Sequence, residues 1–300
     1  MATDTCPVVS ARNVAKYYGT RLGIADVSFD VHPGDIVGFL GPNGSGKTTM
    51  MRILMGLIRP TRGELSVFGE PVDRRSHLYR TRIGYLPGTL GLYEHMTVGE
   101  FLHFLAAMRQ MDCWRRIRDI AERLDLALDA RISGLSKGNK QKVGVVQALM
   151  HSPGLLLLDE PTSGLDPIIQ RVFEEIIAEE TRKGVAIILS SHVMHEVDQL
   201  ANRAIILAHG RIVVDDTVEG LKSRIRRQLR FEFPEPVTAE TFEKIEGVHS
   251  VVVAGATMTC VVVGSESPLL AAAAAHKVES VFSNEPSLED IFLEQTGNHQ

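Results

Sequence analysis

Gly41-Pro42-Asn43-Gly44-Ser45-Gly46-Lys47-Thr48 is the stretch of this 300-residue chain that decides its fold. Its pattern is a glycine, four residues of any kind, and then Gly-Lys-Thr. Such glycines let successive backbone N–H groups turn toward phosphate oxygens. The apolar run Asp35–Leu40 leads into this stretch, and helical spacing follows it to about Leu57. A strand, a glycine-rich turn and a helix in this order predict a phosphate-binding loop (P-loop) whose helix N-terminus points at the anion.

A second apolar run ends in two carboxylates, because Asp159 and Glu160 directly follow Leu155–Leu158. Ligands of open α/β sheets bind at the carboxyl ends of the strands, so we expect both side chains near the phosphate loop. Asp159 and the Thr48 hydroxyl are predicted to hold Mg²⁺, and Glu160 to orient or deprotonate the attacking water. An acidic turn after a buried strand is common, and its pairing with the phosphate loop favours the functional interpretation.

Two further segments lie at the same predicted edge. His192 follows the apolar run Val185–Ser190, within reach of a γ-phosphate, although a lone histidine there is more often structural. Asp166 follows Glu160 closely and precedes Pro167, which is expected to begin a helix. Taken alone, Asp166 would be only a helix cap.

The segment Leu135-Ser136-Lys137-Gly138-Asn139 precedes Asp159 by about twenty positions. Ser136 is suited to cap the helix that follows, and Gly138 permits close approach, so this is a second helix N-terminus suited to anions. The chain's own phosphate loop is already expected to bind one nucleotide. A spare phosphate-binding terminus therefore suggests a site completed by a second copy of the chain.

Strand and helix patterns alternate along most of the chain, which predicts a largely parallel sheet. Three helical segments with no strand between them interrupt the pattern at about 91–151. After residue 220 a smaller unit reads strand, helix, strand, strand, helix, strand, followed by a closing helix at Ser287–Phe292. The predicted fold is an α/β P-loop NTPase core at 1–220 with an inserted helical subdomain, plus a small α+β (βαββαβ) accessory domain at 221–300.

Composition excludes several classes of protein. A net charge of −5 gives no electrostatic reason to expect binding to nucleic acid. The three cysteines form no CxxC pair, which argues against a disulfide framework or zinc site. No apolar run approaches the roughly 20 residues needed to cross a bilayer, and the N-terminus does not resemble a secretory signal. The sequence therefore predicts that, if the chain serves a membrane process, the membrane-spanning part belongs to another protein.

These motifs, in this order and with this spacing, resemble the ABC-type ATPase cassette over about residues 8–220. The resemblance implies that ATP and Mg²⁺ are bound, that Glu160 is the catalytic base and His192 a switch histidine, and that Asp159 and Thr48 serve the metal. It also implies that Leu135, Ser136, Lys137, Gly138 and Asn139 contact the nucleotide of the opposite protomer, and that Asp166 lies in a loop linking the two sites. Tyr18 is expected to stack on the adenine of the nucleotide bound by its own chain, and its neighbour Tyr17 is the competing choice. The other residues expected to bind that nucleotide are Gly41, Pro42, Asn43, Gly44, Ser45, Gly46, Lys47, Thr48 and Thr49.

Two positions depart from the family pattern. Gly88 stands where the family has Gln or Glu, a side chain that contacts the metal region and links it to the helical subdomain. Glycine offers no such side chain, so coupling or turnover is expected to differ. The segment at Leu135–Asn139 reads LSKGN rather than LSGGQ, which adds a positive charge and shortens a polar side chain.

The C-terminal unit, ending in Glu285–Leu293, resembles cassettes of daunorubicin- or bacitracin-resistance exporters. The resemblance implies the motor subunit of an exporter, peripheral at the cytoplasmic face of the membrane. Its partners would be an integral membrane permease, contacted around Gly88–His103, and a second copy of itself, with no nucleic acid. The alternative is a soluble ABC-type ATPase acting on ribosomes or DNA. Ribosome-acting members usually carry two cassettes and DNA-repair members a long coiled coil, and neither fits this sequence. The transported substrate is not readable from it.

Overall fold

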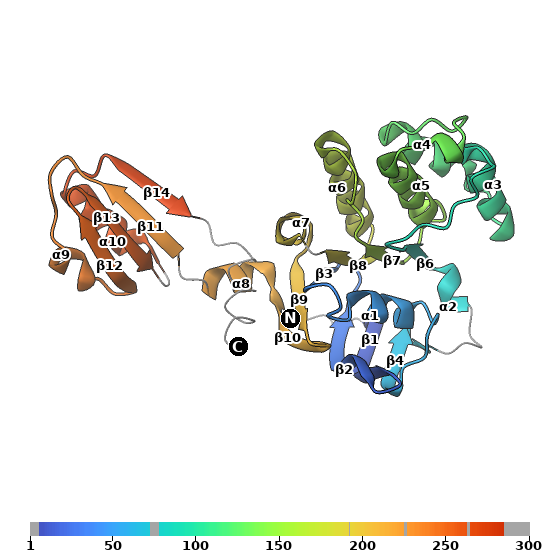
Figure 1. Cartoon of the computed structure of the whole chain (residues 1–300), viewed down its shortest axis with the longest axis horizontal. Helices are drawn as coiled ribbons and strands as arrows, with labels where there is room; N and C mark the ends of the chain where they lie inside the picture. Colours follow the sequence, from blue (N-terminus) through green and yellow to red (C-terminus); the bar gives the residue numbers. More distant parts are fainter. Residues whose placement is uncertain (1–5, 73–77, 192, 225–226, 263–264, 285–300) are drawn as a thin grey trace. The chain divides into compact units, whose positions relative to one another are not determined.

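The computed structural model describes residues 6–72, 78–191, 193–224, 227–262 and 265–284. The chain divides into two compact units, Met1–Asp216 and Thr217–Gln300 (Figure 1). The sequence analysis placed the boundary after residue 220. Across the described residues, no helix combines the length and the apolar character needed to cross a bilayer.

A six-stranded sheet in the order β10-β9-β3-β8-β7-β6 forms the centre of the first unit. Its pairs β3/β8, β3/β9, β7/β8 and β6/β7 are parallel, as the sequence predicts. Every residue of β3, β7 and β8 is buried, which explains why these strands read as continuous apolar runs. The strands are β3 (Ile36–Leu40), β6 (Ile83–Leu86), β7 (Leu155–Asp159), β8 (Ala186–Ser191), β9 (Arg203–Ala208) and β10 (Arg211–Thr217).

A second, antiparallel sheet in the order β2-β1-β4-β5 was not predicted. Its first two strands form a hairpin that closes at Tyr18↔Arg21, with Gly19 in the left-handed region that such a tight turn favours. The sequence pattern did not reveal this sheet, because β1 also pairs with β4, which lies more than 40 residues further along the chain. The strands are β1 (Val9–Tyr18), β2 (Arg21–Val31), β4 (Arg62–Val67) and β5 (Glu70–Pro71).

Between β6 and β7 the chain forms three α-helices, which Figure 1 shows grouped near the β6 edge of the sheet. The first of them, α3, begins at a capping box in which Thr97 and Glu100 satisfy each other's backbone N–H. The helices of the first unit are α1 (Lys47–Leu54), α2 (Leu78–Thr81), α3 (Val98–Met108), α4 (Trp114–Arg123), α5 (Lys137–Leu149), α6 (Pro167–Arg182) and α7 (Met194–Leu200).

Two ion pairs join helix α4 of this insertion to helix α6, which follows β7. The Arg123 guanidinium donates to both carboxylate oxygens of Glu179, at 2.8 and 2.9 Å. Arg116 lies 2.7 Å from Glu180, whose side chain is only 4% exposed. A bidentate arrangement is the geometry in which such a contact adds stability as well as a fixed orientation. The two ion pairs fasten the inserted helices to the rest of the unit.

The second unit contains helix α8 (Val218–Arg224) and a four-stranded antiparallel sheet in the order β12-β13-β11-β14. Its elements follow the predicted βαββαβ order, and the sheet order is that of the split βαβ fold. Phe231, Phe242 and Met258 are fully buried in its own hydrophobic cluster. The predicted closing helix at Ser287–Phe292 lies outside the described residues. The elements after α8 are β11 (Arg227–Glu232), α9 (Glu240–Glu243), β12 (Val248–Ala254), β13 (Thr257–Val262), α10 (Ser267–Ala275) and β14 (Ser280–Asn284).

His151, just after α5, predicts a pH-dependent stability. Its Nε2 lies 3.0 Å from the Ile83 carbonyl, and burial, with a smaller effect of Arg109, lowers its pKa to about 4. The unfolded chain takes up this proton below about pH 6.5, whereas the folded chain resists it until about pH 4. We therefore expect the free energy of unfolding of the first unit to fall by up to about 3 kcal/mol between pH 6.5 and 4.

Denaturant unfolding of the chain and its His151→Gln variant at several pH values measures this effect. The variant should lose less stability than the wild type over that interval, because it has no imidazole to protonate. An identical pH dependence in the two proteins would show that His151 is not the group responsible.

Candidate functional site

The phosphate loop connects the buried strand β3 to helix α1. Gly41 and Gly46 have φ values of 147° and 114°, in the region that favours glycine. A Cβ at Gly41 would lie 2.2 Å from the Leu207 carbonyl oxygen, and one at Gly46 would lie 2.4 Å from a methyl group of Ile24. Both glycines are therefore required by the backbone and by close packing, and they present the N-terminus of α1 to the space outside the sheet.

Lys47, the first residue of α1, lies along the loop. Its Nζ donates to the carbonyls of Gly41 at 2.6 Å and Pro42 at 3.3 Å, and the residue is 6% exposed. Burial lowers the pKa of the ammonium, and the carboxylates of Glu160 and Asp159 oppose that shift. The cation is thus desolvated and held at the loop, where an anionic ligand would stabilise it further.

Asp159 ends strand β7 beside the start of α1. The Thr48 hydroxyl donates to its two oxygens at 3.4 and 3.1 Å, and the Ser190 hydroxyl also donates to it. The carboxylate is nearly buried, yet these three hydrogen bonds come from neutral hydroxyls. A carboxylate beside a hydroxyl is the hard oxygen donor set that suits Mg²⁺.

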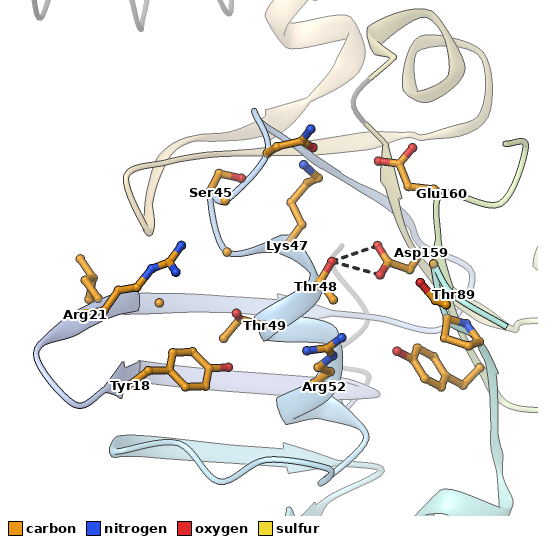
Figure 2. A pocket seen from close by; sticks show the side chains of 18 residues that line it. Tyr18, Arg21, Ser45, Lys47, Thr48, Thr49, Arg52, Thr89, Asp159 and Glu160 are labelled. Atoms are coloured by element: carbon orange, nitrogen blue, oxygen red, sulfur yellow. Dashed lines mark hydrogen bonds between the residues drawn. The ribbon is translucent and has the colours of Figure 1, made fainter. Parts of the chain in front are cut away.

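Glu160 follows in a left-handed conformation, with φ of 54°. Its N–H donates to the Ser190 carbonyl at 3.1 Å. This hydrogen bond extends the pairing of β7 with β8 by one residue past the end of β7. A non-glycine residue with this φ is uncommon and persists only where its surroundings hold it, frequently at functional sites. The turn directs the carboxylate toward the phosphate loop (Figure 2).

A cavity of about 660 Å³ brings these groups together (Figure 2). Tyr18 lines it and Tyr17 does not. Arg21 and Arg52 also line it, and sequence reasoning missed both because neither belongs to a motif. The predicted residues among its lining are Tyr18, Asn43, Gly44, Ser45, Gly46, Lys47, Thr48, Thr49, Asp159 and Glu160, whereas Gly41 and Pro42 are absent from that set.

The five residues Leu135–Asn139 do not line this cavity. Ser136 caps α5 by accepting a hydrogen bond from the Asn139 N–H at 3.2 Å. Lys137 donates to the Ser163 hydroxyl at 3.1 Å. A Cβ at Gly138 would lie 2.4 Å from the Gly164 carbonyl, so glycine is what allows α5 to approach this loop. A second anion-suited helix terminus therefore exists, separate from the first.

The loop after Glu160 is held at its other end as well. Asp166 caps α6 by accepting from the N–H groups of Ile168 and Ile169, at 3.0 and 3.1 Å. Glu196 on α7 accepts hydrogen bonds from Thr162 and from Ser191, the latter at 2.6 Å. Sequence reasoning missed Glu196, because its partners lie far apart from each other in the chain: Thr162 is in the loop after β7, and Ser191 is the last residue of β8. His192 lies outside the described residues.

Gly88 lines the cavity, and a Cβ built on it would lie 3.2 Å from an Asp159 carboxylate oxygen. The main chain at this position therefore runs directly beside the acidic residue. Thr89 lines the cavity next to it and is labelled beside Asp159 in Figure 2. The hydroxyl of Thr89 is thus a polar side chain on the cavity directly beside Gly88, the position where the family has Gln.

Comparison with known proteins decides the family. The family model described as ABC transporter matches residues 24–163. The Nod factor export ATP-binding protein I of Paraburkholderia xenovorans is 33% identical over 95% of this chain and 95% of its own. The chain belongs to the ABC transporter ATP-binding protein family. It is an ATP-binding, ATP-hydrolysing cassette of that family, and the predicted P-loop α/β fold is confirmed.

Other similarities agree with this membership. The bacitracin transport ATP-binding protein BcrA of Bacillus licheniformis is 34% identical, over 75% of this chain and 74% of its own. A solved ATP-binding subunit of an ABC transporter is 30% identical with a TM-score of 0.68, covering 72% of this chain and 92% of its own. A dimeric bacterial ABC transporter cassette shares the fold at 22% identity, with a TM-score of 0.61 over 70% of this chain and 98% of its own.

Proposed function

We propose that this ABC cassette is the motor of an exporter and drives a separate membrane permease. The observation that carries the proposal is the cavity in which the phosphate loop, Lys47, Asp159 and Glu160 face one another. Relatives named for Nod factor export and bacitracin transport support export as the direction. The absence of a membrane-spanning helix among the described residues is consistent with a peripheral position at the cytoplasmic face.

In cis, the loop N–H groups and Lys47 bind the phosphates of ATP, and Tyr18 stacks on the adenine. Tyr18 supports this role because it lines the cavity and the residue is 46% exposed. Glu160 orients or deprotonates the attacking water, since its carboxylate lies on the cavity beside Lys47 and Asp159. His192 is proposed as a switch histidine on its position after strand β8 alone.

Thr48 and Asp159 would hold Mg²⁺ through their oxygens, which suit that ion. Mg²⁺ would supply charge neutralisation for the developing phosphate charge. The hydroxyl of Ser190 keeps the Asp159 carboxylate oriented for that purpose through the hydrogen bond described above.

Two copies of the chain would close around two ATP molecules. The support is the second capped helix N-terminus at Ser136, which is suited to an anion but does not line the cavity of its own chain. Leu135, Ser136, Lys137, Gly138 and Asn139 would then contact the partner's nucleotide. Asp166 would lie in the loop between the two sites. The dimeric cassette of the same fold is consistent with this arrangement.

The permease would dock near the start of the helical insertion, at about 88–103. Aromatic and sulfur-containing side chains are exposed close to this segment: Tyr93, Phe104 and Met108 are 47%, 38% and 67% exposed. The Tyr93 ring contacts Phe101 and Phe104 with centroids 5.9 and 5.8 Å apart. Exposed apolar clusters of this kind are typical of protein contact sites.

Affinity purification of the tagged chain from detergent-solubilised membranes of its host, followed by mass spectrometry, tests this function. We expect a polytopic membrane protein in stoichiometric amount. A Tyr93→Ser variant, which keeps the cavity intact, should recover less of it. Recovery with ribosomes or nucleic acid instead would favour the soluble-ATPase alternative and overturn the transport proposal.

A further inference from the structure

The side-chain amide of Gln141 connects two segments that the proposed function uses separately. Gln141 lies in the second turn of α5, the helix capped by Ser136, and is 8% exposed. Its Nε2 donates to the carbonyl of Glu160 at 3.1 Å and to the carbonyl of Pro161 at 2.9 Å. A primary amide carries two N–H groups, so a single side chain satisfies both carbonyls.

These bonds fix the backbone around the residue proposed as the catalytic base. The N–H of Glu160 is held by Ser190 on β8, and its carbonyl is held by Gln141 on α5. The left-handed φ of 54° at Glu160 is unfavourable for a residue with a Cβ and persists only where neighbouring contacts hold it. The two hydrogen bonds are therefore among the contacts that hold the backbone of Glu160 in this conformation, with its side chain on the cavity.

Two other contacts of α5 lie along the same loop. Lys137 donates to Ser163, and Gly138 lies against the carbonyl of Gly164. The first two turns of α5 thus run beside residues 160–164. A movement of this helix terminus, which is proposed to contact the partner's ATP, would act on the carbonyl of Glu160 through the Gln141 amide.

We propose that Gln141 is a positioning residue for ATP hydrolysis: it sets the orientation of Glu160 in its own chain according to where α5 lies. Gln141 is not among the residues that line the cavity. Binding of the partner's ATP at the N-terminus of α5 would in this way align Glu160, the proposed base, in the cavity of the same chain. The inference rests on the proposed roles of Glu160 and of the dimer.

The experiment compares the steady-state ATPase kinetics of the full chain with those of two variants. Gln141→Met keeps the side-chain length and the helix propensity but has no N–H donor, and Gln141→Glu keeps the side-chain shape. We expect kcat to fall about tenfold in both, as small misplacements of a catalytic group do, with KM for ATP within twofold of wild type. Gln170→Met is the matched control, because Gln170 likewise donates its amide to a loop carbonyl, that of Leu165. It should leave kcat within twofold.

A double-mutant comparison distinguishes positioning of Glu160 from a structural role in α5. In a Glu160→Gln background, adding Gln141→Met should leave the slow residual turnover and the ATP-induced dimer, measured by size-exclusion chromatography, unchanged. An equal tenfold loss in that background, or a weakened dimer, would show that Gln141 supports the helix and would overturn the inference. Failure of Glu160→Gln itself to slow turnover would instead contradict the proposed function.

Discussion

Replacing Glu160 by Gln is expected to lower kcat for ATP hydrolysis by about 10²- to 10³-fold while ATP still binds. The amide keeps the shape of the side chain and its place at the cavity, but it cannot accept a proton from water. Lys47 should remain in position, because its hydrogen bonds go to the carbonyls of Gly41 and Pro42 and not to Glu160. Phosphate release measures kcat, and a fluorescent ATP analogue measures affinity.

The same variant should accumulate as an ATP-bound dimer, because contacts across two bound nucleotides would persist when neither is cleaved. Size-exclusion chromatography with ATP and Mg²⁺ reports this species. Glu64→Gln, at an exposed position of β4, removes the same charge and serves as the control. Turnover of Glu160→Gln near the wild-type rate would show that another group activates the water.

Replacing Lys47 by Ala is expected to weaken ATP binding by about 10- to 100-fold, which corresponds to the loss of charge-assisted hydrogen bonds to phosphate. The loss should be large because this ammonium is buried and already desolvated, so it binds an anion without first shedding its water. Titration of the two proteins with ATP, followed by calorimetry, gives the ratio of dissociation constants.

AMP, which lacks the β- and γ-phosphates, provides the internal comparison for this variant. Its weaker binding should change much less, since Lys47 is expected to reach only the outer phosphates. Lys244→Ala, at an exposed site in the second unit, removes one positive charge elsewhere and should leave both affinities unchanged. An equal loss for ATP and AMP in Lys47→Ala would indicate a collapsed loop rather than a lost phosphate contact.

Local patterns were sufficient to predict much of the core of the site. The phosphate loop and the Asp159–Glu160 pair each follow a buried strand within a few residues, so their placement depends on short-range geometry. The parallel sheet then brings both strand ends to one edge. The choice between Tyr17 and Tyr18 needed the structure, because adjacent residues of a strand point to opposite sides and the sequence does not say which side faces the cavity.

Long-range contacts account for what the sequence could not show. Gln141 is 19 residues from Glu160 in the chain, and an isolated glutamine in a helix carries no pattern. Glu196 contacts Thr162, 34 residues away, and only the folded sheet places them together. The antiparallel sheet was missed for the same reason, since β1 pairs with β4 across the whole phosphate loop and helix α1.

The separate hydrophobic clusters of the two units have a consequence for how mutations in this protein should be assessed. Phe231 and its neighbours form a cluster that shares no residue with the cluster around β3 and α1. A cavity made by Phe231→Ala, at a cost of roughly 3–5 kcal/mol, is therefore confined to the second unit. Melting curves of such a variant would contain two events, and a single melting temperature would describe neither the ATPase nor its C-terminal companion.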